Sequence, residues 1–516
     1  MFPRNIRHIA PWKLAQIIAL LSEQLYLDSW SGNQAVQDQF TKALELSGIK
    51  RPGDQYDPHS GGARTYLAQL ECLGLFFRRG IGSAHLTVAG EDMANGMPPL
   101  PILQELLFRH QYPSVYSQNQ NVKIHPLIKV QPFLFVLELI DRFGYLKYDE
   151  LVVPVLYGHN SSCLEICMNK IEKLRCGAPL ESVVNSLEDI YTPRTTGRSF
   201  AKALADVRDI ANTCKNYLQA ACLIDVETFE GKSQIKISAD YSESVQNAIK
   251  NKKDNFIKGW DSGESFQRKL GCWDRSKDTR DLSVREHVSP ASAIIAAQFY
   301  RHAGVAPVTA YPVAFVQEMT SGYGFSQTVV EKAVEPLLSK ALTYFESTYL
   351  DLAKSGGNKA IEFEKATGRL FSEKLKFSVQ HTGQKKRIGH VGGYADLFLI
   401  AVDDSHCAII DTKSTAAYNF NASDYRAMAN DYIPGFIELS PDGKQRKLEF
   451  CAYIAGGFKG GMDSKLINIR EKTGVPVSAI SASNFLTICK NDFPQEKVRS
   501  WFRTGKELLS NSFNEA

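Results

Sequence analysis

The sequence predicts a multidomain chain that combines α/β and α+β folds. With 516 residues the chain is too long for one ordinary core, so we expect two to four domains. Helix–hairpin patterns recur in the N-terminal half, and the C-terminal part alternates helices with β-rich runs. A hydrophobic content of 44% and a charged content of 22% are typical of globular proteins.

The first helix–hairpin pattern lies in residues 61–88. Ala63, Leu67 and Leu70 share one face of a helix that is expected to end at Gly74. Two short strands, 75–79 and 85–88, follow and are joined by a Gly-rich turn. A helix followed by a small hairpin is typical of the end of a winged helix-turn-helix module.

The same pattern recurs 151 residues later, where Tyr217 and Leu218 take the places of Tyr66 and Leu67. Two copies favour two modules over a chance pattern. We therefore predict four segments: a winged-helix DNA-recognition module at 1–110, a second at 111–249, a linker with a small helical module at 250–325, and a last domain at 326–516. Helices are expected at 133–143, 290–302 and 327–353, and the last of these opens the final domain.

A helix-turn-helix presents a polar outer face to the major groove, while basic hairpin or loop residues reach phosphates. The formal net charge of +4 neither establishes nor opposes binding to nucleic acid. For each candidate, a solvated face of an ordinary helix–hairpin unit is the competing interpretation. The candidate DNA-contacting residues are Arg64, Thr65, Gln69, Arg78 and Arg79 in the first module and Arg194, Arg198, Lys215, Asn216 and Gln219 in the second.

The charge-rich segment 250–287 is typical of a linker. Because Phe256, Trp260 and Trp273 interrupt it, we expect it to lie against a domain rather than free in solution.

The stretch "CAIIDTKS", residues 407–414, places Asp411 and Lys413 on one face of the end of a buried strand. A preceding strand and a turn at 403–405 form a hairpin that should bring Asp396 close to Asp411. Two carboxylates suit Mg²⁺, and a neighbouring lysine can orient or deprotonate an attacking water. The pattern therefore favours phosphodiester hydrolysis, with a structural surface ion pair as the alternative.

The segment "YADLFLIAVDDSHCAIIDTKSTAAYN" resembles the PD-(D/E)xK cleavage domain of type IIS restriction endonucleases of the FokI and AlwI kind. The resemblance covers about residues 327–513, and it includes the Tyr418–Asn419 pair and the run Gly457–Gly460. It implies a mixed central sheet flanked by helices. The residue roles that it implies are metal binding for Asp396, Asp411 and the Thr412 carbonyl, catalysis for Lys413, a metal-proximal acid at Glu364 and a DNA contact at Lys459.

Two departures from the family pattern stand out. Ala395 replaces the proline of the motif, which supplies no ligand. Arg426 and Asn430 occupy the positions at which FokI-type domains pair an acid and an arginine between two copies, although Met428 matches. A transient homodimer through residues 424–432 is therefore a hypothesis.

We predict a Mg²⁺-dependent type IIS endonuclease that binds a short asymmetric site in double-stranded DNA and cuts at a fixed distance outside it. A strand-nicking enzyme or the large subunit of a heterodimeric cutter is the alternative. From another class, a winged-helix DNA-binding regulator with an inactive nuclease-like domain remains open. The chain lacks an Asn/Asp-Pro-Pro-aromatic tetrapeptide, so the cognate DNA methyltransferase is expected to be a separate chain.

No apolar run approaches the roughly 18 residues that a membrane helix needs, and no cleavable signal is evident at the start. We therefore expect no membrane partner and a prokaryotic cytoplasmic location. The ten cysteines, without any Cys-x-x-Cys pair, are expected to be buried and unpaired.

Overall fold

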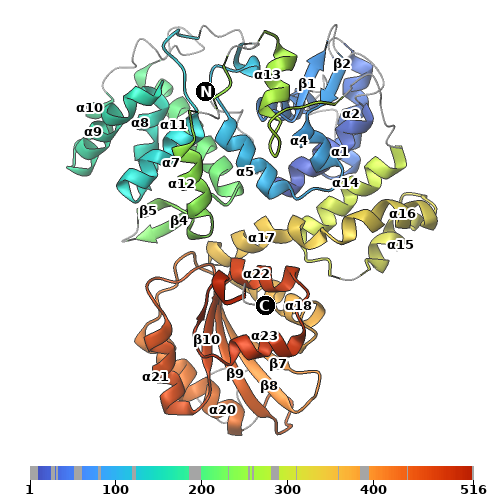
Figure 1. The fold of residues 1–516 in the computed structure, drawn as a ribbon, viewed down its shortest axis with the longest axis vertical. Coiled ribbons are helices and arrows are strands. Elements are labelled where there is room, and N and C mark those ends of the chain that lie inside the picture. Colours follow the sequence, from blue (N-terminus) through green and yellow to red (C-terminus); the bar gives the residue numbers. More distant parts are fainter. Residues whose placement is uncertain are drawn as a thin grey trace. The chain divides into compact units, whose positions relative to one another are not determined.

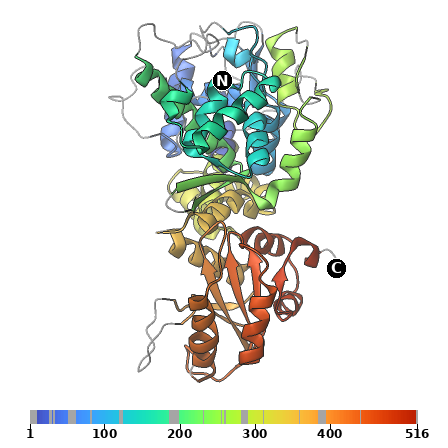
Figure 2. The ribbon, with the colours of Figure 1, turned by 90° about the vertical axis from the view of Figure 1, so that its left-hand side faces the viewer.

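The structure is a computed structural model (Figures 1 and 2). It describes the chain except for residues 1–9, 25–29, 31–32, 51–60, 80–82, 119–123, 185–198, 230–231, 254–255, 259–260, 281–289, 310, 358, 384–393, 439 and 514–516. The chain divides into two compact units. The N-terminal unit comprises Met1–His302 and Pro312–Lys340, and the C-terminal unit comprises Ala303–Tyr311 and Ala341–Ala516.

The first helix–hairpin pattern of the N-terminal unit forms as predicted. Ala63, Leu67 and Leu70 are buried, and β1 and β2 pair antiparallel with Phe76 opposite Leu86. The elements of this part are α1 (Pro11–Gln24), α2 (Gln34–Leu46), α3 (Gly61–Cys72), β1 (Phe76–Arg79), β2 (Ser83–Leu86), α4 (Val88–Ala94), α5 (Pro99–Arg109) and α6 (Val115–Gln118).

The second helix–hairpin pattern is also confirmed, and its strands form a three-stranded sheet in the order β3-β5-β4. The predicted helix before it ends at Gly144, whose φ of 73° places it in the left-handed region that favours glycine. The elements are α7 (Pro132–Phe143), β3 (Leu146–Lys147), η1 (Tyr148–Leu151), α8 (Val152–Tyr157), η2 (Ser161–Cys163), α9 (Leu164–Arg175), α10 (Leu180–Val183), α11 (Phe200–Ala220), β4 (Ile224–Phe229), β5 (Lys232–Ile237), η3 (Ala239–Tyr241) and α12 (Ser242–Lys250).

The charged segment after α12 lies against the first module, as expected. Gln267, on α13 (Gly263–Leu270), is buried and donates to the carbonyls of Glu71 at 2.7 Å and Phe76 at 3.0 Å. Trp273 Nε1 donates to Asp92 at 2.8 Å. These bonds make the segment part of the N-terminal unit.

The helices at the predicted start of the last domain are divided between the two compact units. The expected helix over 327–353 is two helices, α16 (Gln327–Leu338) and α17 (Ala341–Ser355). Because α16 packs on α15 (Val313–Ser321), it belongs to the N-terminal unit, together with most of α14 (Pro290–Val305). The main part of the C-terminal unit begins at Ala341.

The C-terminal unit contains a six-stranded mixed sheet in the order β11-β10-β9-β8-β7-β6. The pairs β6–β7 and β7–β8 are antiparallel, whereas β8–β9, β9–β10 and β10–β11 are parallel. The elements are α18 (Lys359–Glu373), β6 (Ser378–His381), β7 (Leu397–Ile400), β8 (His406–Lys413), α19 (Ala422–Arg426), η4 (Ala427–Tyr432), α20 (Ile433–Glu438), β9 (Lys447–Ala455), α21 (Asp463–Thr473), β10 (Val477–Ser481), α22 (Ala482–Lys490), α23 (Gln495–Phe502), β11 (Glu507–Leu508) and η5 (Ser510–Phe513).

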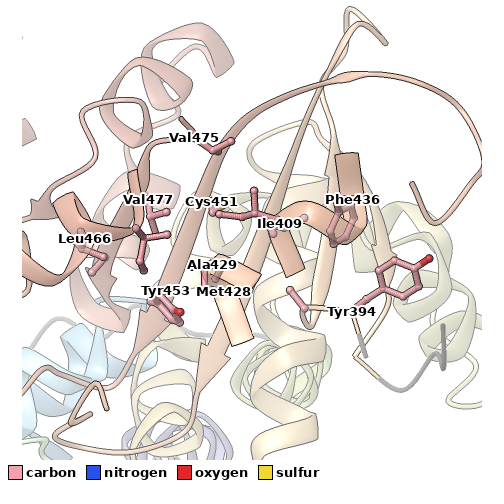
Figure 3. Close-up of a cluster of buried hydrophobic side chains, with 14 of the residues drawn as sticks. Tyr394, Ile409, Met428, Ala429, Phe436, Cys451, Tyr453, Leu466, Val475 and Val477 are labelled. Atoms are coloured by element: carbon pink, nitrogen blue, oxygen red, sulfur yellow. The ribbon is translucent and has the colours of Figure 1, made fainter. Parts of the chain in front are cut away.

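Helices cover both faces of this sheet, which confirms the predicted mixed sheet flanked by helices (Figures 1 and 2). On one face, Ile409, Cys451 and Tyr453 from the strands pack with Met428 of η4 and Leu466 of α21 (Figure 3). Because side chains alternate along a strand, residue 411 lies on the same face as Ile409. This apolar cluster therefore holds the strand end that carries the candidate site.

No helix within the described ranges is long and apolar enough to cross a bilayer. The ten cysteines are free, and all except Cys176 are buried, as expected from their irregular spacing.

Candidate active site

Asp411 and Lys413 form an ion pair at the end of β8. Lys413 Nζ lies 3.0 Å from Asp411 Oδ2. Asp411 is only 4% exposed, because the apolar cluster and the neighbouring strand β9 enclose it. The predicted placement of both side chains on one strand face is confirmed, and the pair joins a buried Asp411 to a half-buried Lys413.

Asp396 lies beside this pair, directly before β7. In the antiparallel register Leu397 pairs with Ile410, so the next position outward sets Asp396 opposite Asp411. Asp396 Oδ2 accepts hydrogen bonds from the N–H and the Oγ1 of Thr412, at 2.7 and 2.6 Å. A Cβ at Gly383 would lie 2.9 Å from Asp396 Oδ1, so only glycine leaves room for this carboxylate. The predicted convergence of the two acids is therefore present.

Burial and two neighbouring acids make the ionisation of Asp411 unfavourable. Burial raises the pKa of Asp411 to about 7, and the nearby Asp396 and Asp424 carboxylates act in the same direction, while Lys413 opposes them. Burial alone would lower the pKa of Lys413, but the charge of Asp411, its hydrogen bond and the charges of Asp396 and Asp424 together raise it. Lys413 is therefore a charged ammonium near neutral pH.

Glu364 lies on α18, a helix that packs against the sheet, and it is near Asp396. Its Oε1 lies 3.0 Å from His381 Nδ1, at the end of β6. Burial raises the pKa of Glu364, the His381 hydrogen bond lowers it, and the Asp396 charge raises it again. Glu364 thus lies within electrostatic reach of Asp396.

Sequence reasoning missed two residues of this environment. His381 follows from the sheet, because it pairs with Leu397, one position from Asp396. Asp424 belongs to a separate short helix, where it forms a capping box with Asn421, and its charge raises the pKa of both Asp411 and Lys413. No linear spacing signals Asp424, because the chain reaches it through the loop that contains Tyr418.

The chemistry of these groups fits a magnesium ion. In the part of the chain that the structure describes, no group of three or more His, Cys, Asp or Glu side chains is arranged to hold a metal. Mg²⁺ does not require such a group, because it is commonly held by one or two carboxylates and keeps several waters. A divalent cation at Asp396 and Asp411 would offset the burial and the repulsion that together raise the Asp411 pKa.

One DNA-contact candidate of the N-terminal unit is wrong. Gln69 is buried, and its Nε2 donates to the hydroxyl of Tyr217 at 3.0 Å, so it joins the two helix–hairpin modules instead of facing a groove. The helix face was misassigned because neither copy of the sequence pattern indicates how one module packs on the other. Arg64 is exposed and donates to Gln37, Thr65 is half-buried, and Arg78 is exposed and pairs with Glu71 at 3.4 Å.

The candidate DNA-contacting residues of the second module differ in their exposure. Gln219 is exposed, whereas Asn216 and Lys215 are half-buried, and Lys215 Nζ lies 5.7 Å from the centroid of the Tyr148 ring. In the C-terminal unit, Lys459 is exposed and its N–H donates to the carbonyl of Tyr418 at 2.9 Å. The candidates Arg194 and Arg198, and the side chain of Arg79, lie outside the described residues.

Comparison with protein families identifies the segment that contains this site. Residues 324–509 match the family model described as "FokI, cleavage domain", which confirms the resemblance predicted for the last domain. The match supports a cleavage domain of the restriction endonuclease kind. Among curated proteins, none matches the chain.

Comparison with solved structures returns distant similarities. The structure of the restriction endonuclease FokI aligns over 98% of both chains with 12% identity and a TM-score of 0.28. FokI bound to DNA aligns over 96% of this chain and 97% of that one, with 12% identity and a TM-score of 0.27. The BpuJ1 endonuclease binding domain, in complex with modified DNA, aligns over 50% of this chain and 90% of that one, with 14% identity and a TM-score of 0.31. These scores are too low to carry an argument.

Proposed function

We propose that the chain is a type IIS restriction endonuclease. It binds a short asymmetric site in double-stranded DNA through its N-terminal unit and hydrolyses phosphodiester bonds at a fixed distance outside that site through its C-terminal unit. The observation that carries the proposal is the ion pair between the buried Asp411 and the half-buried Lys413 beside Asp396, within a segment that matches the FokI cleavage-domain family.

The metal-binding residues would be Asp396, Asp411 and the Thr412 carbonyl. A magnesium ion bound there would polarise the scissile phosphate and offset its charge. Thr412 holds the Asp396 carboxylate through two hydrogen bonds, so the orientation of this carboxylate is set before any ligand arrives.

Lys413 would act through its positive charge. The acids around it raise its pKa, which favours an ammonium that orients the attacking water and stabilises negative charge on the phosphate in the transition state. The same shift disfavours a role for Lys413 as a general base, because a base must first lose its proton. Glu364 would help to orient the water or the metal shell from α18.

One observation favours the nicking alternative. At the position where FokI-type domains place an arginine for pairing between copies, this chain has Asn430, and Lys472 of the same domain donates to its Oδ1. This contact occupies Asn430 within its own chain. An inactive, purely regulatory domain is disfavoured, because Asp396, Asp411 and Lys413 are together at one strand end.

Digestion of supercoiled plasmid libraries with the full chain and Mg²⁺ tests the proposal. We expect linear products whose sequenced ends lie at a constant offset from a common asymmetric site. Accumulation of nicked circles that never become linear would replace the homodimeric cutter with the nicking enzyme. Binding without any cleavage, over varied sequences and Mg²⁺ concentrations, would refute the nuclease assignment. We also expect a separate methyltransferase to protect the same site.

A further inference from the structure

The N-terminal unit contains a lysine-lined pocket with a volume of about 620 Å³. None of the residues that we predicted to contact DNA lines it. Its basic residues are Lys129, Lys252, Lys253 and Lys258, and Glu138 is the one acid among the lining residues that the structure describes. A pocket of this size can hold a nucleotide-sized group.

Hydrogen bonds from buried or paired groups fix the walls of the pocket. The N–H of Lys129 donates to the carbonyl of His159 at 2.8 Å, which ties the start of α7 to the loop that contributes Asn160. On the opposite wall, the buried Gln111 accepts from the N–H of Ile257 at 2.8 Å and donates to its carbonyl at 3.2 Å. Because Phe256 and Lys258 flank Ile257, these two bonds position both lining residues.

Among the lining residues that the structure describes, positive charge exceeds negative charge. Lys252 pairs with Glu138 at 2.5 Å, which leaves Lys129, Lys253 and Lys258 exposed at the rim without an acid of the described lining to match them. Lys129 Nζ lies over one face of the Phe256 ring, 5.4 Å from its centroid, so the aromatic ring and a positive charge are in contact in the pocket.

Helix α7 adds to the positive potential. Gln131 and Leu134, at its start, line the pocket. The Gln131 side chain forms no cap on the helix, and the first turn contains no acid. The helix N-terminus therefore contributes partial positive charge that none of its own first-turn side chains offsets.

We propose that this pocket binds the phosphate of a nucleotide unit, with the ring of Phe256 against the sugar or base. The DNA backbone is the favoured source, because the three rim lysines are exposed and reachable by a long polymer. In that form the inference rests on the proposed function. A free nucleotide offers the same chemistry from another source.

The test uses the full chain with Lys129, Lys253 and Lys258 all replaced by alanine. Its matched control replaces Lys42, Lys173 and Lys269, three exposed lysines of the same unit that do not line the pocket. Duplex affinity is measured in EDTA across a salt series, and ATP binding is measured separately without DNA. Thermal unfolding verifies that both variants fold, and a Lys→Arg triple at the pocket positions should restore binding.

For each phosphate that the pocket variant no longer neutralises, the slope of log K against log salt concentration should shrink by roughly 0.9. A decrease in the pocket variant that is absent from the control supports the DNA backbone as the ligand. An unchanged slope together with loss of ATP binding supports a free nucleotide. If neither changes, or if the control changes equally, the inference is overturned. Because these measurements need no cutting, failure of the wild type to cleave DNA would refute only the proposed function.

Discussion

The acidic site of the C-terminal unit and the lysine pocket of the N-terminal unit differ in the sign of their charges and in how far those charges are exposed to solvent. Asp411 is 4% exposed, and burial makes its charge unfavourable until a cation or a proton compensates it. The three rim lysines of the pocket are exposed, so their charges stay hydrated and can act at a distance. Charged groups stabilise a transition state most strongly when a rigid element holds them away from water. Charges that attract a polyanion from a distance must instead be exposed to solvent.

The largest expected effect is a loss of cleavage without a loss of DNA binding, which would assign these two activities to different regions. Lys413→Ala should lower the cleavage rate at least about a thousandfold, because a charge that stabilises the transition state is removed from a buried site. Site affinity and its salt slope should stay within about twofold of wild type. The measurements are single-turnover cleavage and binding in EDTA.

Lys444→Ala is the control, because Lys444 is an exposed lysine of the same unit whose Nζ lies 3.8 Å from Asp404. It should leave cleavage unchanged. Loss of DNA binding in Lys413→Ala would contradict the division of labour between the two units.

A smaller effect on the cleavage rate is expected at Glu364, on the helix that packs beside Asp396. Glu364→Gln should lower cleavage by about 10–100-fold, the range typical of residues that orient metal ligands or their water. Glu362→Gln, on the same helix but exposed, serves as the control. If both variants cleave like wild type, Glu364 is only a solvated helix carboxylate that pairs with His381.

The acidic site was predictable from the sequence because its parts are local. A hairpin of two β-rich runs fixes which residues face each other, so Asp396, Asp411 and Lys413 could be placed together before the structure was known. Glu364 depended on family resemblance, because a helix packed on a sheet has no fixed register with it. Asp424 could not be placed, since it reaches the site through a loop.

Unlike the acidic site, the lysine pocket could not be predicted from the sequence. Its lysines come from segments more than 100 residues apart, and no periodicity links Lys129 to Lys258. The same limit explains the error at Gln69. Helical periodicity ranks faces by polarity, and a buried polar side chain that bonds to another module is indistinguishable from a solvated one.

The contact of Gln69 can be tested through its partner. Tyr217→Phe removes the hydroxyl that accepts from Gln69 Nε2 and leaves a buried amide hydrogen unpaired. We expect the free energy of unfolding to fall by about 1–2 kcal/mol. The repeat supplies the control, since Tyr66→Phe removes only a 3.5 Å contact with the carbonyl of Ile49 and should change stability by less than about 0.5 kcal/mol.

Both variants should bind the same DNA sequence as wild type. A change of the preferred site in Tyr217→Phe, without loss of stability, would return Gln69 to the candidate DNA-contacting residues.

The smallest expected effect concerns the pH dependence of stability in the absence of metal. Since burial raises the pKa of Asp411 to about 7, the folded chain holds a proton that the unfolded chain has released above about pH 4. The folded state therefore binds more protons between these values, and stability falls as pH rises through this window. Asp411→Asn removes the titrating group, so the variant should be more stable than wild type at pH 8 and equal to it near pH 4.

We expect the gain at pH 8 to be on the order of 1 kcal/mol, since Lys413 loses part of its ion pair when Asp411 is replaced. Urea unfolding in EDTA at both pH values measures it, and Mg²⁺ should narrow the difference at pH 8 by favouring the ionised wild-type carboxylate. Asp403→Asn provides a control of opposite sign. The Ser405 N–H bond holds the pKa of Asp403 below its usual range, so that variant should lose stability at pH 8. Equal pH profiles for wild type and Asp411→Asn would mean that the Asp411 carboxylate is already compensated without a metal.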